Sequence, residues 1–154
     1  MSQFLQVVLA AMLPIGELRL SLPLGVCGLR LGLAETFLLS VLGNMLPIPF
    51  LYLALGPLER LGRRIAVLDR ILQWVFARTR RKSSALERYG PVGLITFVAI
   101  PLPGTGAWTG AIAAYLLGMP FGRAMFCLAA GVAGAGVIVS GLVALLPYLF
   151  AVCS

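Results

Sequence analysis

Two ionisable residues, Glu17 and Arg19, lie two positions apart inside an otherwise apolar stretch, LPIGELRLSLPLG (residues 13–25). Charges at membrane depth are costly, so such residues are functional candidates by default. Glu17 is suited to bind and release a proton or to attract a cationic ligand. The planar donors of Arg19 suit an anion such as a phosphate. The alternative is a structural pair that satisfies one loop.

The residues around this pair favour a non-helical backbone. Pro14, Gly16 and Pro23 flank or interrupt the stretch, and both residue types disfavour a regular helix. Side chains two positions apart point to the same side of an extended segment, but to different faces of a helix. We therefore expect Glu17 and Arg19 to share one side of a turn.

A second stretch, IPLPGTGAWTG (residues 100–110), interrupts an apolar run over 91–118. Its prolines would end an incoming half-helix and its glycines permit a tight reversal, which predicts the tip of a re-entrant loop. The outgoing half-helix would begin near 105 or 107, with free N–H groups that favour an anion. A simpler interpretation is a proline-kinked span. The candidate binding residues here are Pro103, Gly104, Thr105, Gly106, Trp108 and Thr109.

Asn44 completes the candidate site residues. It lies in a span-length apolar run, where it would line a cavity or bridge two helices. Trp108 would stack on a substrate or fill the core. The sequence holds no histidine, nucleophile–base pair, metal-ligand spacing or phosphate-binding loop motif. We therefore expect neither an enzyme nor a bound metal or cofactor.

Composition indicates where these residues are held. The chain has 154 residues, of which 60% are hydrophobic, and its mean hydropathy is +1.02. This predicts an integral membrane protein, surrounded by lipid. A cleavable signal peptide is disfavoured because the first basic residue, Arg19, follows the first apolar stretch. The three cysteines lie apart in apolar surroundings, so we expect free thiols rather than disulfides.

The apolar runs suggest one plan used twice, in opposite orientations. We expect an all-α membrane protein with an inverted repeat, in which each unit has a re-entrant helical hairpin followed by a transmembrane helix. The units are residues 1–57, with a hairpin over 4–29 and a span over 36–57, and residues 89–154, with a hairpin over 91–118 and a span over 124–150.

The polar segment 58–88 joins the two units. It carries nine of the twelve basic residues and only three acidic ones, so the positive-inside rule predicts a cytoplasmic location. Apolar residues spaced by three and four predict an amphipathic helix on the membrane surface. A coiled-coil-like contact between protomers is the alternative. Because most of the net charge of +7 lies in this one segment, we expect no nucleic-acid partner.

The motifs together resemble a known family. LPIGELRLSLPLG, LLSVLGNMLPIPF (residues 38–50) and YGPVGLITFVAIPLPGTGAWTG (residues 89–110) are similar to the small multidrug export protein family of prokaryotes. The resemblance covers nearly the whole chain and implies export of small compounds from the cytoplasmic membrane. The architecture also resembles the DedA membrane proteins, which implies flipping of lipid phosphates. Unlike that group, the second tip has no charged residue.

We therefore expect a small transporter, proton-coupled through Glu17, that exports small amphiphilic compounds through a site between the two tips. Its partners would be membrane lipids, the substrate and a second copy of the chain, because one small protomer has few helices to enclose a cavity. One alternative is a DedA-type flippase for lipid-linked phosphates. The other is a non-transporting membrane scaffold that acts through the basic segment 58–88.

Overall fold

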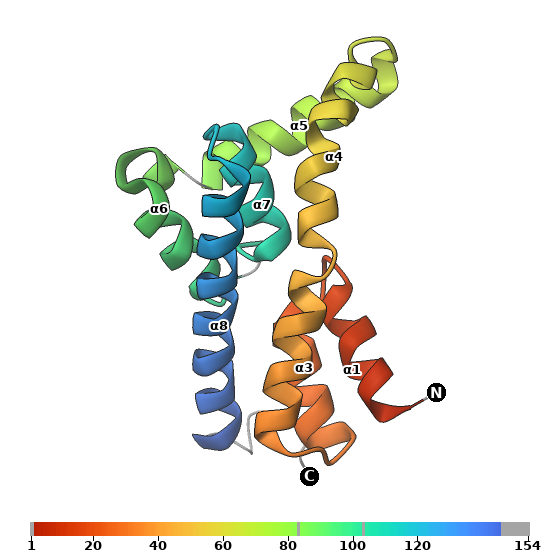
Figure 1. Cartoon of the computed structure of the whole chain (residues 1–154), viewed down its shortest axis with the longest axis vertical. Coiled ribbons are helices and arrows are strands. Elements are labelled where there is room, and N and C mark those ends of the chain that lie inside the picture. The colour runs from red at the N-terminus through yellow and green to blue at the C-terminus, as the bar shows by residue number, and fades with distance from the viewer. Residues whose placement is uncertain (1, 83, 103, 146–154) are drawn as a thin grey trace.

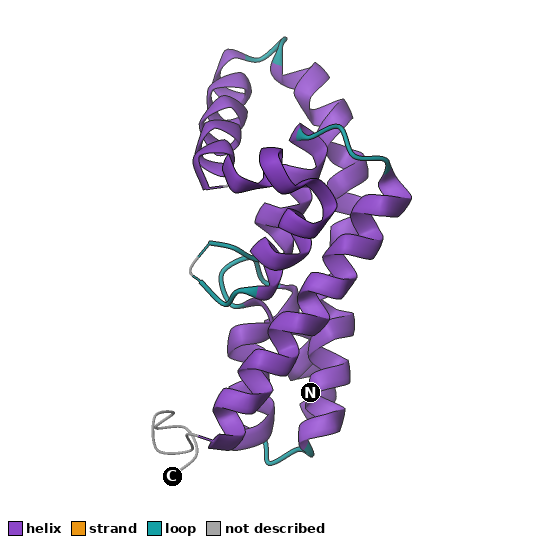
Figure 2. Cartoon of the chain, turned by 90° about the vertical axis from the view of Figure 1, so that its left-hand side faces the viewer, coloured by secondary structure: helices purple, strands orange, loops and turns teal. Residues whose placement is uncertain are grey.

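The protein is built from helices throughout the part described by the computed structural model, residues 2–82, 84–102 and 104–145 (Figures 1 and 2). No strand occurs in this part of the chain. The elements are α1 (Gln3–Met12), α2 (Glu17–Pro23), the π-helix η1 (Leu24–Gly28), α3 (Leu33–Met45), α4 (Ile48–Gly62), α5 (Ala66–Lys82), α6 (Ser84–Ala99), α7 (Ala107–Leu116) and α8 (Phe121–Leu145).

Two helical stretches are long and apolar enough to cross a bilayer, which requires about 20 residues. One runs from Leu33 to Gly62 and has 30 residues, and the other is α8, with 25 residues. They contain the predicted spans, although the predicted end of the second span at 150 lies outside the described residues. The first stretch is interrupted between α3 and α4, where Pro47 and Pro49 cannot donate backbone hydrogen bonds.

Two short-helix hairpins occupy opposite halves of the long axis. α1 and α2 have 10 and 7 residues, and α6 and α7 have 16 and 10 residues, with a kink in α6 at Gly90, whose φ of +55° is not helical. The α1–α2 hairpin lies beside α3 in one half, and the α6–α7 hairpin lies in the half that contains α5 (Figure 1). Both connecting loops are near the middle of the molecule (Figures 1 and 2). The helices of each hairpin are therefore too short to extend along the whole molecule.

Small residues allow α8 to pack tightly against both halves. A Cβ atom added at Gly131 would lie 2.7 Å from the Val98 side chain of α6, and one added at Gly136 would lie 2.5 Å from the Phe37 ring of α3. Both distances are too short for a side chain. These glycines therefore allow close contact of α8 with α6 and α3 within one chain.

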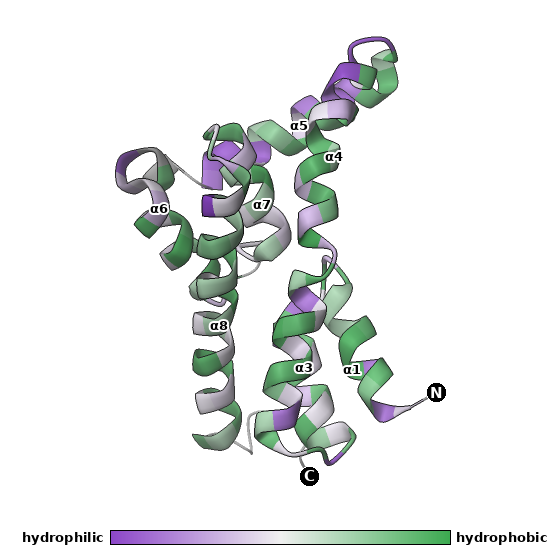
Figure 3. Cartoon of the chain, in the orientation of Figure 1, coloured by the Kyte–Doolittle hydropathy of each residue, from purple (hydrophilic) through white to green (hydrophobic). Residues whose placement is uncertain are grey.

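The basic segment 58–88 is divided among three helices instead of forming the single expected helix. α4 ends at Gly62, a turn follows, and α5 begins at Ala66. α5 buries Leu72 and Phe76 against α4 and α7. The hydrophilic residues gather around α5 and its turn, at one end of the molecule (Figure 3).

The cysteines differ from the expectation of three free thiols. Cys127 is free and buried, but Cys27, near the end of η1, is disulfide-bonded. Chain spacing did not reveal this bond, because a disulfide depends on which segments meet in space rather than on local apolarity.

Candidate functional site

The two hairpins meet at a polar junction in the middle of the molecule. Glu17, the first residue of α2, is only 8% exposed. One of its carboxylate oxygens lies 3.5 Å from the backbone nitrogen of Trp108, which donates to it, and the N–H of Ala107 is a further donor. A Cβ atom at Gly106 would overlap the carboxylate. Glu17 therefore occupies the N-terminus of α7, where only glycine leaves room.

Arg19 contacts the other side of the same loop. Its guanidinium donates to the backbone carbonyls of Leu102 and Thr105, and at 3.4 Å to that of Ile100. The Thr105 hydroxyl lies 3.2 Å from the same group and itself donates towards the carbonyls of Ile100 and Leu102, at 2.9 Å each. Arg19 therefore binds carbonyls of the loop that follows α6, two of which, those of Ile100 and Leu102, also accept backbone hydrogen bonds within the loop.

The charge of Glu17 matches the helix end that it meets. A helix N-terminus carries partial positive charge and a C-terminus partial negative charge, each worth about 0.3–1 kcal/mol to a suitable side chain and up to about 2 kcal/mol when partly buried. Glu17 meets the start of α7, whereas Arg19 binds carbonyls of the loop that follows α6. The first hairpin thus supplies the charges that the second tip lacks.

Local backbone geometry differs from the expected extended turn, because residues Glu17–Pro23 form a short helix. Glu17 and Arg19 nevertheless reach the same loop. Glu17 has φ of +45°, which is unusual for a residue with a side chain and costs of order 1–3 kcal/mol. The regular helical geometry that would separate the two side chains is therefore absent at Glu17.

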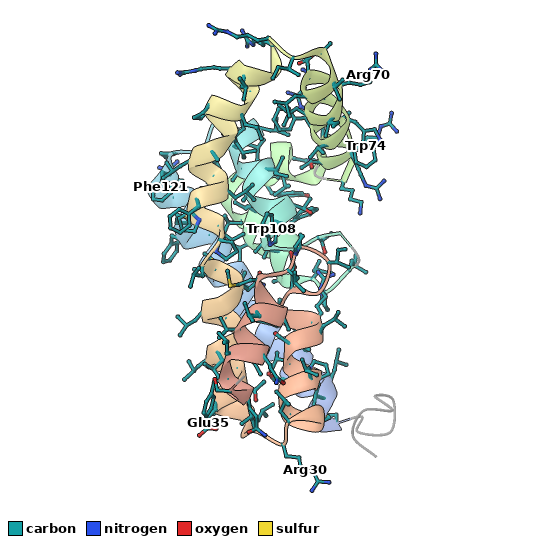
Figure 4. All side chains as sticks on the ribbon, turned by 90° about the vertical axis from the view of Figure 1, so that its right-hand side faces the viewer. Arg30, Glu35, Arg70, Trp74, Trp108 and Phe121 are labelled. Atoms are coloured by element: carbon teal, nitrogen blue, oxygen red, sulfur yellow. The ribbon has the colours of Figure 1, made fainter. Side chains whose placement is uncertain are left out.

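An apolar groove of about 740 Å³ lies beside the junction. Trp108, whose backbone N–H donates to Glu17, contributes its side chain to the groove. This side chain lies near the middle of the long axis (Figure 4), and its indole nitrogen is buried without a hydrogen-bond partner among the described residues. The groove is lined by Gln6, Leu9, Ala10, Met12, Leu13, Pro14, Leu24, Pro47 and Trp108.

Two other predicted residues face the basic helix α5. Gly104, with φ of +79°, and Thr109 line a pocket of about 160 Å³ together with Arg78 and Lys82. A Cβ atom at Gly104 would overlap the Lys82 ammonium group. Sequence reasoning did not associate these cations with the tip. Their spacing of four positions places them on one helix face, but does not indicate which element that face meets.

Asn44 is buried in α3, with 2% of its surface exposed. Its side-chain oxygen has no hydrogen-bond partner among the described residues. Pro103 lies outside the described residues. No cluster of three potential metal ligands occurs within the described ranges. The structure thus brings Glu17 and Arg19 to the second tip, but does not place Asn44 in contact with it.

Comparison with known proteins gives one finding that bears on this site. The family model described as "Putative small multi-drug export protein" matches residues 17–138. The match begins at Glu17, after the loop of the first hairpin, and includes α2, α5, the loop of the second hairpin and most of α8. No curated protein and no solved structure matched the chain. The family match and the two span-length apolar helices together mark the chain as a membrane protein.

Proposed function

Because the chain belongs to the putative small multi-drug export protein family, we propose that it is a proton-coupled exporter of small amphiphilic compounds rather than an enzyme. The observation that supports this proposal most strongly is the position of Glu17. This buried carboxylate holds the start of α7, and an apolar groove that shares Trp108 lies next to it. The groove would hold the apolar part of a substrate.

Protonation of Glu17 would change the junction directly. The ionised carboxylate accepts strong hydrogen bonds from the N-terminus of α7. A protonated carboxyl group loses the charge that this helix end favours, so the two tips would separate more easily. Arg19 would remain on the loop carbonyls and keep the tips aligned. If Glu17 binds a proton from one side of the membrane and releases it to the other, the groove would open to the two sides in turn.

The arrangement of the two hairpins supports the proposed inverted repeat. Each hairpin is short, the hairpins occupy opposite halves, and their tips meet. We propose that both are re-entrant, in the cytoplasmic membrane of a prokaryote with α5 on the cytoplasmic side. In a cysteine-free background, a membrane-impermeant maleimide should label Arg30→Cys in intact cells, but Arg70→Cys only after permeabilisation. The reverse pattern would contradict this topology.

We also propose a homodimer. The two span-length stretches bury only about a third of their residues within one chain, 33% and 39% of the window, and α8 exposes Val137 at 64%. A second copy would enclose the groove more fully than lipid does. Light scattering of the protein in nanodiscs should give twice the protomer mass, and a protomer mass at all concentrations would contradict the proposal.

The central test is transport by Glu17→Gln, which keeps the shape of the side chain but cannot be deprotonated. In proteoliposomes with an imposed pH gradient, we expect it to abolish movement of amphiphilic dyes, while the protein still folds. Glu35→Gln is the matched control, because Glu35 is an exposed carboxylate at the far end of α3 (Figure 4). Gradient-driven transport by Glu17→Gln equal to wild type would refute the coupling role.

The pocket between α5 and the second tip favours one alternative, translocation of lipid-linked phosphates. Arg78, Lys82 and the Thr109 hydroxyl line a space of about 160 Å³, and these groups suit a phosphate. If this alternative is correct, Arg78→Gln should abolish transbilayer movement of a short-chain polyprenyl phosphate, and Arg70→Gln should not. If the protein exports dyes but moves no polyprenyl phosphate, the lipid-phosphate alternative is wrong and the exporter proposal stands.

A further inference from the structure

A second groove lies between α4, α5 and α7, near the end of the molecule that carries the basic segment. Its volume is about 440 Å³, and four of its residues are polar or charged. It shares no residue with the apolar groove at the junction. The residues that line it are Glu59, Gln73, Phe76, Ala77, Arg80, Tyr115 and Leu116.

The base of this groove is aromatic. Phe76 is 7% exposed, and its ring centroid is 6.4 Å from that of Tyr115, with the rings tilted by 36°. The Tyr115 ring also meets that of Tyr52 edge to face, at 6.1 Å. The exposed parts of these two packed rings offer an apolar surface to a planar ring.

The Glu59 carboxylate, which lines the groove, already has two partners. Tyr115 donates its hydroxyl to one oxygen of Glu59 at 2.9 Å. The Arg63 guanidinium lies 3.5 Å from the other oxygen. A cationic ligand would have to compete with both groups, so Glu59 is poorly suited to bind a second cation.

Arg80, in contrast, is available to a ligand. It is exposed, and no carboxylate of the described residues lies within ion-pair distance of it. Its planar guanidinium matches the geometry of a carboxylate, sulfonate or phosphate group. The surrounding segment, with nine basic and three acidic residues, adds a positive field that concentrates anions. The Gln73 amide can donate to the same ligand group.

We propose that this groove binds planar aromatic anions, with the ring on Phe76 and Tyr115 and the anionic group on Arg80. In the exporter proposed above, it would be the site that first captures such a substrate from the cytoplasmic side. The substrate class therefore rests on the proposed function, but binding itself does not. It can be measured in the absence of any transport.

The test is equilibrium dialysis of naphthalene-2-sulfonate against the full-length protein in neutral-lipid nanodiscs, with empty nanodiscs as blank. The matched probe is 2-naphthyltrimethylammonium, which has the same ring and the opposite charge. We expect the sulfonate to bind at least tenfold more tightly than the ammonium compound. Equal binding of the two probes, or preference for the cation, would overturn the proposal.

Two neighbouring arginines give a matched pair of variants. Arg80→Gln and Arg81→Gln remove the same charge from α5, but only Arg80 lines the groove. We expect Arg80→Gln to weaken sulfonate binding at least tenfold and Arg81→Gln less than twofold. If both variants lost sulfonate binding equally, the binding would depend only on the general positive field of α5. That result would overturn the proposed site. Glu59→Gln should leave sulfonate binding equal or tighter, and a loss would also count against an anion site.

Transport by Glu17→Gln separates this proposal from the exporter mechanism. If Glu17→Gln binds the sulfonate normally but does not transport, both proposals stand. If Glu17→Gln transports normally while Arg80→Gln loses binding, the coupling role fails and the anion groove stands. If sulfonate binding does not depend on Arg80, the groove proposal fails whatever Glu17→Gln does.

Discussion

The two hairpins differ in what they contribute to the junction between them. The first hairpin supplies charged side chains, Glu17 and Arg19, on a short helix. The second supplies backbone, in the N–H groups that begin α7 and the carbonyls that follow α6. Neither contribution is satisfied alone, because a buried charge needs partners and a helix end needs caps. An uncharged tip therefore does not imply an uncharged site.

Reversing the charge of the first hairpin should have the largest effect. Glu17→Lys would place a cation against the positive N-terminus of α7 and near Arg19, and breaking a buried charged contact costs about 3–5 kcal/mol. We expect loss of transport and a strongly lowered unfolding temperature, measured by light scattering and intrinsic fluorescence on heating in detergent. Glu35→Lys, at an exposed position, should do neither. Unchanged stability of Glu17→Lys would mean that the two hairpins do not depend on this contact.

A substitution at Gly106 tests the contribution of the second hairpin, which supplies backbone groups rather than charge. Gly106→Ala adds one methyl group where the Glu17 carboxylate lies, and overpacking of this kind costs about 1–3 kcal/mol. We expect weaker transport without any change of charge. Gly141→Ala is the control, since a Cβ atom there meets nothing within 4 Å. If the two alanine variants transport equally, the carboxylate does not need the space at Gly106.

The residues of the two loops could be predicted from the sequence, but not which of them contact each other. Apolar run lengths and prolines predicted the spans, and LPIGELRLSLPLG and IPLPGTGAWTG identified both loops, because these signals are local. The contact between Arg19 and the Leu102 carbonyl spans 83 positions, and nothing local specifies it. The approach of Arg78 and Lys82 to Gly104, and the Tyr115–Glu59 hydrogen bond, depend in the same way on how α5 packs.

Arg19→Lys sharpens the role of the second charge. Lysine keeps the positive charge, but its ammonium group cannot reproduce the planar fork that reaches several carbonyls at once. A hydrogen bond to a charged group contributes about 1.5–3 kcal/mol, and we expect a loss near the lower value. Transport should fall several-fold and remain measurable, whereas Arg19→Ala should abolish it. Wild-type transport by both variants would show that the carbonyls of the second hairpin need no cation.

Substitution of Asn44 should give the smallest change in stability, because Asn44 takes no part in the contacts between the charged side chains of the first hairpin and the backbone of the second. Its side-chain oxygen is buried without a partner among the described residues, so Asn44→Leu removes a polar group that gains little in the folded state. Such replacements are nearly neutral or stabilising, and we expect a change within about 1 kcal/mol in thermal unfolding. If Asn44 contacts the substrate, dye transport should still fall several-fold. Unchanged transport together with unchanged stability would assign Asn44 to helix packing alone and confine the transport machinery to the junction of the two hairpins.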